Sequence, residues 1–175
     1  MEEAFLSAND VLIGFKLGDE AERLNYATSM TCAMIQPNGI LTFAHAGNTR
    51  LYVVRNERVL QLTKDHTEGQ KLVDAGRISE EDYYTAIERL SLYNGIGISP
   101  TPEVQTAAVQ LKKNDVVIMT TDGIHYAYRK EALFDILLNT ETMDEAAERM
   151  IETALKLRVY PDNISVNVMW YHGND

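Results

Sequence analysis

The sequence is poor in cysteine and proline and has no long hydrophobic run. It contains one Cys and 4 Pro among 175 residues. A single cysteine excludes an internal disulfide and a cysteine-rich zinc site, and Cys32 lies among apolar residues, where we expect an inert buried thiol. No apolar run approaches the ~20 residues of a membrane helix, and Met1-Glu2-Glu3 lacks the basic start of a signal peptide. We therefore expect a cytoplasmic protein with no membrane partner.

Positive charge is scarce as well. Lys and Arg total 16 against 26 Asp and Glu, which gives a net charge of −10. Because this charge repels polyanions, we expect no nucleic-acid partner. The four His residues lack the i, i+4 spacing of a zinc helix, and there is no Gly-rich phosphate loop or nucleophile elbow. The many carboxylates leave one positive option, which is a site for a hard cation such as Mg²⁺ or Mn²⁺.

Short apolar runs predict a series of strands. Asn38-Gly39 separates the first two runs and is a strong hairpin signal, and residues 55–58 connect a second hairpin. The predicted strands span residues 30–36, 40–46, 51–54, 59–62, 104–111, 116–120 and 164–171. With helices before and after them, these strands indicate an α+β fold, a layered antiparallel β-sandwich flanked by helices. We expect a single domain over residues 1–175.

Helices are predicted at both ends and in the middle. The best-signalled one follows Thr142, with Glu145 completing a capping box. Residues 65–99 are expected to be an insertion, with a short helix near 70–75, capped by Asp65 or Thr67, and another helix opening at Ser79 and continuing to Leu90. The first helix is predicted by an apolar face of Ala4, Ala8, Val11, Leu12 and Phe15. No capping residue precedes this face, so we expect that the chain begins inside an element.

Two carboxylates flank predicted strands at the edge of the sheet. Asp122 directly follows the run 116–120, and Asp162 precedes the last strand. If the two strands are antiparallel neighbours, the end of one meets the start of the other, and the carboxylates converge. A divalent cation would supply the counter-charge that such a pair needs. The alternative is that Asp-Gly and Asp-Asn simply form turns.

A series of short motifs occurs along the chain in a fixed order. They are Ala8-Asn9, Ala27-Thr28-Ser29, Gly47-Asn48-Thr49-Arg50, Thr63-Lys64-Asp65-His66-Thr67, residues 72–79, Thr121-Asp122-Gly123-Ile124 and Asp162-Asn163-Ile164-Ser165. Taken together they resemble motifs of the metal-dependent serine/threonine phosphatases of the protein phosphatase 2C family, particularly the compact bacterial members. The last two resemble the family's late metal-ligand motifs, Ser-Asp-Gly-Leu and Asp-Asn-Ile-Thr.

The resemblance implies a function and a site. In that family two Mn²⁺ or Mg²⁺ ions share an Asp and a bridging water that attacks a phosphoserine or phosphothreonine. It therefore implies Mn²⁺ or Mg²⁺ as cofactor, a phosphorylated protein or peptide as partner, and Asp122 and Asp162 as ligands of one metal. Weaker candidates, as ligands or as neighbours of ligands, are Asn48, Gly123 and Asn163. A flap-like insertion at about residues 68–99 borders the site, and the flap or substrate region is implied to include Asp65, His66 and Asp74.

The sequence departs from the family pattern in two ways. The family's early Arg, its Asn-Glu-Asp segment and its Asp-Gly-x-Gly-Gly turn have no counterpart here, so the resemblance implies an N-terminally shortened fold without the bridging carboxylate. Asn48 stands where bacterial members have an Asp, and an amide is a poorer cation ligand. We expect a phosphatase that is inactive or weak in this chain. The shortened sheets should expose an edge that invites a homodimer or a partner chain.

Two other hypotheses remain open. The chain could be a pseudophosphatase, a non-catalytic binding or regulatory module that retains the fold. It could also be an unrelated α+β domain in which Asp122 and Asp162 only form turns. The demand for metal separates the three, because only the enzyme should need Mn²⁺ or Mg²⁺ and depend on both carboxylates.

Overall fold

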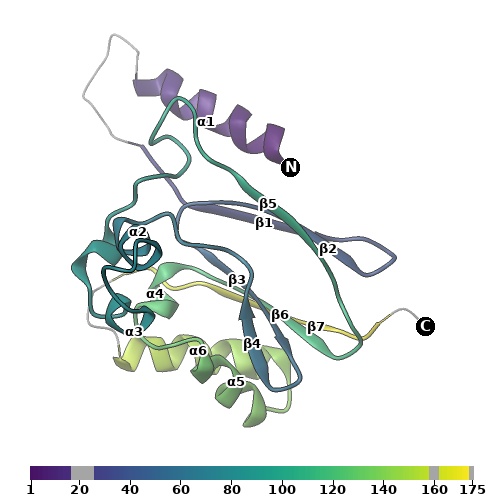
Figure 1. Ribbon diagram of the computed structural model, residues 1–175. Coiled ribbons are helices and arrows are strands. Elements are labelled where there is room, and N and C mark those ends of the chain that lie inside the picture. Colours follow the sequence, from purple (N-terminus) through teal and green to yellow (C-terminus); the bar gives the residue numbers. More distant parts are fainter. Residues whose placement is uncertain (17–25, 158–161, 174–175) are drawn as a thin grey trace. The chain divides into compact units, whose positions relative to one another are not determined.

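The computed structural model describes residues 1–16, 26–157 and 162–173, and these residues form two sheets and a set of helices (Figure 1). Pairing between antiparallel strands dominates, so the predicted α+β class is confirmed. Within the described ranges, no helix combines the length and the apolar character that a membrane crossing requires. The chain packs as two compact units that alternate along the sequence. The first comprises Met1–Ile35, Leu41–Asn48 and Lys64–Ala108, and the second Gln36–Ile40, Thr49–Thr63 and Val109–Asp175.

The smaller sheet has the strand order β1-β2-β5. Its strands are β1 (Met30–Ile35), β2 (Ile40–Ala46) and β5 (Gln105–Gln110). β1 and β2 form the predicted hairpin, with Met30 opposite Ala46 and Ile35 opposite Leu41. Gly39 at the turn has a φ of +80°, which glycine adopts without steric cost.

Cys32 does not have the predicted buried environment. It is exposed, in a strand where exposed and partly buried side chains alternate. Because successive side chains of a strand point to opposite faces, the apolar neighbours of Cys32 in sequence are not its neighbours in space. The expectation of an inert buried thiol is therefore wrong.

Helix α1 (Glu2–Lys16) forms where it was predicted, but only part of its predicted face is buried, since Ala8 and Leu12 pack against the core. Val11 and Phe15 are 58% and 68% exposed, while Phe5 and Asn9 are almost completely buried. The Asn9 amide explains the rotation of the helix. Its Nδ2 donates to the Ser99 carbonyl at 3.0 Å, and its Oδ1 accepts the Gly97 N–H at 2.8 Å. The prediction used only apolar side chains, so it did not include the hydrogen bonds of Asn9 that orient the helix.

The larger sheet has the strand order β4-β3-β6-β7, with β4 and β7 at its edges (Figure 1). Its strands are β3 (Arg50–Arg55), β4 (Arg58–Gln61), β6 (Asp115–Thr120) and β7 (Val166–Tyr171). β3 and β4 form the second predicted hairpin. Asn56 and Glu57 occupy its turn with φ values of 49° and 63°, the left-handed conformations of a two-residue hairpin turn.

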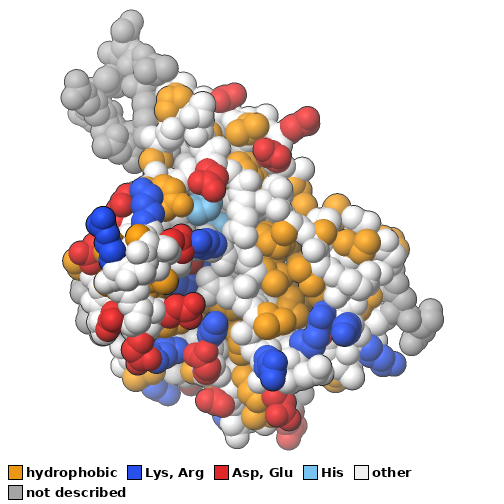
Figure 2. All heavy atoms as spheres, in the orientation of Figure 1, with side chains coloured by type: hydrophobic (Ala, Val, Ile, Leu, Met, Phe, Trp, Pro, Cys, Tyr) orange, Lys and Arg blue, Asp and Glu red, His pale blue; other side chains and the backbone are white. Residues whose placement is uncertain are grey.

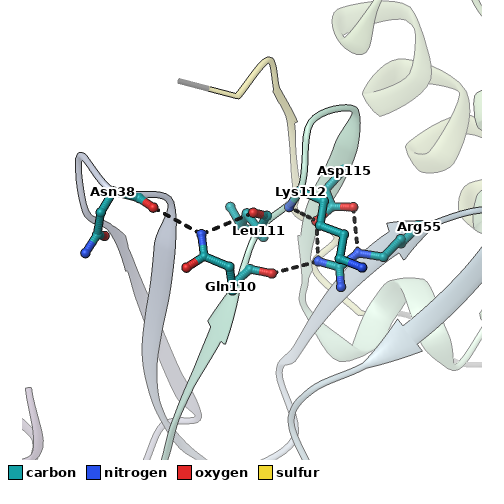
Figure 3. Close-up of polar contacts among 6 residues, drawn as sticks. All are labelled: Asn38, Arg55, Gln110, Leu111, Lys112 and Asp115. Atoms are coloured by element: carbon teal, nitrogen blue, oxygen red, sulfur yellow. Dashed lines mark hydrogen bonds and ion pairs between the residues drawn. The ribbon is translucent and has the colours of Figure 1, made fainter. Parts of the chain in front are cut away.

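A buried ion pair ties β3 to β6 (Figure 3). Arg55 Nε donates to Asp115 Oδ1 at 2.9 Å and Arg55 Nη2 to Asp115 Oδ2 at 2.5 Å. The same guanidinium donates to the Gln110 carbonyl at 2.8 Å, and the Lys112 N–H donates to Asp115 Oδ2 at 2.8 Å. The hydrogen bonds that Arg55 donates to the Asp115 carboxylate raise the pKa of Arg55. Because Asp115 is almost completely buried, its charge depends on this set of donors.

Three helices accompany the larger sheet, and α5 and α6 run along one face of it (Figure 1). They are α4 (Asp122–His125), α5 (Glu131–Leu138) and α6 (Met143–Leu157). The Thr142 hydroxyl caps α6 by accepting the Glu145 N–H at 3.1 Å, as predicted. The apolar stripe of α6 packs into a core that includes Tyr52, Ile118, Leu133, Met150 and Ala154.

Candidate functional site

The candidate site is the end of the β6–β7 pair, where the strands leave the sheet. Thr120 lies opposite Val166, and the pairing continues for one more residue. The Thr121 N–H donates to the Ser165 carbonyl at 3.1 Å, and the Ser165 N–H donates to Thr121 Oγ1 at 2.9 Å. The prediction that these strands are antiparallel neighbours ending at one edge is confirmed. Asp122 follows this pairing directly, and Asp162 lies three residues before it.

Gly123 allows the two turns at this edge to touch. A Cβ built on Gly123 would lie 2.6 Å from the Asn163 carbonyl oxygen and 2.9 Å from an Ile164 side-chain carbon. Real Cβ atoms do not approach backbone oxygen that closely, so only glycine fits without displacement. Gly123 and Asn163, both weaker candidates from sequence, therefore meet in the structure through their backbones.

The carboxylates at this edge provide oxygen ligands. Asp122 is partly buried at the first position of α4, and Asp162 is exposed, with its Oδ1 accepting the Asn163 N–H at 2.7 Å. Mg²⁺ is commonly bound by one or two carboxylates, with waters and phosphate oxygens completing the octahedron. Asp122 and Asp162 are thus of the chemical type that could supply one or two of the oxygen ligands of such an ion. Within residues 1–16, 26–157 and 162–173 there is no cluster of three or more His, Cys, Asp or Glu suited to a metal ion.

The first unit contains a separate, buried polar cluster around two histidines. The rings of His45 and His66 lie 5.0 Å apart. His45 Nε2 lies 3.0 Å from the Lys64 carbonyl, which can only accept, so Nε2 carries the proton and Nδ1 accepts from the Thr31 hydroxyl at 2.8 Å. His66 Nδ1 accepts the Gly47 N–H at 3.2 Å.

Burial keeps both histidines neutral at physiological pH. It is the largest cause that lowers the pKa of His45 to about 4, and the neighbouring His66 lowers it further. Burial also lowers the pKa of His66, against the nearby carboxylates of Glu103 and Asp65, which raise it. His66 is thus a buried hydrogen-bond acceptor in this structure.

Asn48 is held by Ser29 in this unit. The Ser29 hydroxyl donates to Asn48 Oδ1 at 2.7 Å, and the Asn48 N–H donates to Ser29 Oγ at 3.1 Å. The amide oxygen is the atom of Asn48 that could bind a cation. Because this oxygen already accepts a hydrogen bond, Asn48 contributes to the structure of the turn.

Asp65 lies just before the segment 68–99 that was predicted to be a flap. It is completely buried, and its Oδ2 accepts the Tyr83 hydroxyl at 2.6 Å. The helix cap is Thr67, whose Oγ1 accepts the Gln70 N–H at 3.1 Å at the start of α2 (Glu68–Asp74). Of the two predicted caps, Thr67 is confirmed and Asp65 is wrong, because Asp65 points to Tyr83 instead.

The helix predicted from Ser79 to Leu90 is shorter than expected. Ser79 and Asp82 form the predicted capping box, but α3 ends at Tyr83 after four residues (Glu80–Tyr83). A 3₁₀ helix, η1 (Ile87–Leu90), follows after a break at Ala86. The Tyr83 hydroxyl bond to Asp65 fixes the end of α3, and this contact is not visible in a local pattern.

Asp74 lies at the exposed end of α2. Lys64 Nζ contacts Asp74 Oδ2 at 2.7 Å, and Gln70 Nε2 donates to Asp74 Oδ1 at 3.1 Å. Burial alone would raise the pKa of Asp74, but the hydrogen bonds from Lys64 and Gln70 prevail and lower it. On the face shown in Figure 2, acidic and basic side chains alternate around α2 and α3.

Sequence reasoning missed Asn94, which organises the polar cluster. Its Nδ2 lies 2.6 Å from His66 Nδ1 and 2.8 Å from the Glu103 carbonyl, and its Oδ1 accepts the Glu103 N–H at 3.0 Å. It also did not predict the hydrogen bonds between Thr121 and Ser165, which join the strand ends. These contacts join residues far apart in sequence, so spacing alone gave no signal for them.

Comparisons with known proteins identify the relatives of the chain. The sequence model of the family Protein phosphatase 2C matches residues 1–91, just over half of the chain. The serine/threonine phosphatase stp of Listeria innocua serovar 6a is 28% identical over 131 residues, which cover 75% of this chain and 52% of that protein. The chain thus spans about half the length of this curated relative.

Solved structures of serine/threonine phosphatases also match the fold of the chain. The structure of the Mycobacterium tuberculosis serine/threonine phosphatase PstP/Ppp matches with a TM-score of 0.80 and 28% identity, over 91% of this chain and 66% of that one. The catalytic domain of PstP in complex with 2 manganese ions matches with a TM-score of 0.76 and 26% identity, over 91% of this chain and 64% of that one. From the match over residues 1–91 and the shared fold, the chain belongs to the protein phosphatase 2C family.

Proposed function

We propose that the chain is a metal-dependent phosphoserine/phosphothreonine phosphatase module in which Asp122 and Asp162 bind Mn²⁺ or Mg²⁺. The observation that supports this most is the register of β6 and β7, which brings the two acidic turns to one edge of the sheet. A bound divalent ion would supply charge neutralisation for phosphoryl oxygens and an acidified water. The manganese ions in the PstP complex support the choice of metal.

We propose further that phosphatase activity of the chain alone is weak or absent. Two carboxylates from described residues can hold one ion, whereas family members position two. Asp122 and Asp162 would still bind and orient the ion, and the contact between Gly123 and Asn163 would keep the two turns in register.

The alternative is a pseudophosphatase that binds a partner without hydrolysis. Asn48 favours it, because a neutral amide is a poorer cation ligand than a carboxylate, and its oxygen already accepts the Ser29 hydroxyl at 2.7 Å. Under this alternative the fold would be retained for binding, and both Asp122 and Asp162 would be dispensable.

A hydrolysis assay distinguishes the phosphatase from the pseudophosphatase. The 175-residue chain is tested on an aryl phosphate and on a phosphothreonine peptide, with and without Mn²⁺. The variant is Asp122→Asn, and the control is Asp10→Asn, which neutralises an exposed carboxylate on α1. Slow turnover that requires Mn²⁺ and is lost only in Asp122→Asn supports the phosphatase. A turnover rate that is the same without Mn²⁺ and in Asp122→Asn contradicts the phosphatase proposal. No turnover under any condition favours the binding module.

A further inference from the structure

The second unit contains a groove that has no part in the candidate site. A hollow of about 370 Å³ is bounded by the β3–β4 turn, the starts of α6 and β6, helix α5 and the end of β7. Its apolar floor includes Val54, Val116, Phe134 and Trp170, and its rim carries Glu57 and Glu141. Its volume lies within the range of ligand-binding pockets. We call these residues the Trp170 groove.

The groove presents apolar surface to solvent. Trp170 is 44% exposed and Leu138, at the end of α5, is 65% exposed. Large apolar side chains that remain exposed around a hollow mark a place where a partner's side chain can be buried. Aromatic residues such as Trp are the side chains that most often dominate such contacts.

The charge around the groove has one dominant sign. A second hollow of about 380 Å³ shares Glu57 and Phe134 with the groove and is lined also by Glu131, Asp135 and Arg58. The carboxylates of Glu57, Glu131, Asp135 and Glu141 form no ion pair with any residue that the structure describes. Four acidic side chains against one arginine favour a basic partner, because complementary charge steers and orients association.

The rim is held in place before any partner arrives. Glu57 has a φ of 63° at the second turn position, where glycine is the residue that adopts this conformation without cost. The adjacent Arg55 is fixed by its two hydrogen bonds to Asp115. Asn114, the residue before Asp115, also lines the groove with a φ of 71°. Such preorganisation reduces the entropy lost on binding.

From these observations we propose that the Trp170 groove docks a peptide segment of a partner protein, in which one large apolar side chain is flanked by Lys or Arg. The apolar side chain enters the hollow against Trp170 and Phe134, and the flanking cations face Glu57 and Glu141. The groove lies at the start of β6, while Asp122 follows its end, so about 20 Å of strand separates them. The proposal does not rest on phosphatase activity.

The chain carries its own reporter for this test, because Trp170 is its one tryptophan. The probe is the peptide Lys-Lys-Phe-Lys-Lys, and the matched control peptide has Glu in place of every Lys. Titration with the basic peptide should shift the tryptophan emission to shorter wavelength in a saturable way, and added salt should weaken the binding. The acidic peptide should leave the emission unchanged.

Variants at Glu57 and Glu141 test whether their charges bind the basic peptide, and they leave the fluorescent Trp170 in place. The double variant Glu57→Gln, Glu141→Gln should bind the basic peptide about fivefold more weakly or worse. The control double variant Glu148→Gln, Glu152→Gln, an equal charge change at exposed positions of α6, should bind as the parent does. Glu57→Gly should relieve the turn and raise the melting temperature while it weakens binding, which excludes unfolding as the cause.

Three results would overturn the proposal. Equal binding of the acidic and basic peptides would show an apolar hollow without charge selection. An unchanged emission with both peptides would show that nothing docks there. Self-association that buries Trp170 and is not displaced by the basic peptide would assign the groove to a second copy of the chain.

Discussion

Thr121 and Ser165 exchange two hydrogen bonds, from the Thr121 N–H to the Ser165 carbonyl at 3.1 Å and from the Ser165 N–H to Thr121 Oγ1 at 2.9 Å. This pair extends the β6–β7 ladder by one residue through a side chain. Asp122 directly follows this pair and Asp162 lies three residues before Ser165. The positions of these two residues at the strand ends therefore depend on the register of β6 and β7. The proposed metal site therefore depends on backbone geometry that substitutions can disturb separately from the carboxylates.

Gly123→Ala tests that dependence. The added Cβ would lie 2.6 Å from the Asn163 carbonyl oxygen, so the turn carrying Asp162 must move. We expect Mn²⁺ affinity to fall at least about tenfold while the far-UV circular dichroism spectrum is retained. Gly14→Ala is the matched control, because nothing lies within 4 Å of its new Cβ. It should leave metal affinity unchanged and stabilise α1 by up to about 1 kcal/mol. Equal Mn²⁺ affinity in both variants would contradict the close approach.

His45 should make stability depend on pH. Its folded-state pKa of about 4 lies below the ordinary 6.5, so between these values the unfolded chain binds more protons. This contribution to stability is complete above pH 6.5 and is lost as the pH falls toward 4. From pH 6.5 to 5 we expect the free energy of unfolding to fall by about 2 kcal/mol, measured by urea denaturation.

His45→Gln provides the comparison, since glutamine does not titrate. The variant should be less stable at pH 7 but show a flatter pH dependence between 6.5 and 5. A slope remains because His66, whose pKa is also lowered by burial, acts in the same direction. An undiminished slope in His45→Gln would show that His45 is not the titrating group.

Arg55→Ala should destabilise the second unit strongly. It removes both charged hydrogen bonds to the buried carboxylate of Asp115, to which the Lys112 N–H still donates. An uncompensated buried charge costs about 3 kcal/mol or more. Arg58→Ala, at an exposed position of the same hairpin, should change the unfolding free energy by less than about 0.5 kcal/mol. Similar values for the two variants would mean that the ion pair contributes little.

Asn9→Ala should show that the orientation of α1 is set by a polar anchor. The substitution removes the hydrogen bonds of the Asn9 amide to the Gly97 N–H and the Ser99 carbonyl. Loss of a hydrogen-bond partner costs a buried polar group about 1–3 kcal/mol of stability. We expect a loss of about 2–4 kcal/mol by denaturant unfolding. Ser7→Ala, on the exposed side of α1, should have almost no effect. A loss in Asn9→Ala below about 1 kcal/mol would contradict the anchoring role.

Local signals predicted most of the elements. The Asn38-Gly39 turn and the period of the strands located both hairpins, and Thr142 and Ser79 located two helix starts. The convergence of the ends of β6 and β7 also followed from sequence, because one buried run and one alternating run end beside acidic turns. The hairpins and helix starts depend on residues close together in the chain, whereas β6 and β7 pair residues as distant as Thr120 and Val166.

Two of the errors have their physical origin in long-range contacts. The buried face of α1 is set by Asn9 binding residues about ninety positions away, and the end of α3 by Tyr83 bonding to Asp65. Cys32 is exposed because its strand alternates, whatever the hydropathy of its neighbours. Three points stay predictions. They are the metal-binding roles of Asp122 and Asp162, the flap at residues 68–99, and the single domain over residues 1–175.

Mn²⁺ binding measured by electron paramagnetic resonance tests the central claim most directly. The parent chain, Asp122→Asn, Asp162→Asn and the control Asp10→Asn are each titrated with Mn²⁺, and the free ion is counted from its six-line spectrum. The account predicts a saturable site in the parent and the control that is weakened at least about tenfold by either change at the β6–β7 edge. Equal binding by all four proteins, or none by the parent, would show that the two aspartates only form turns.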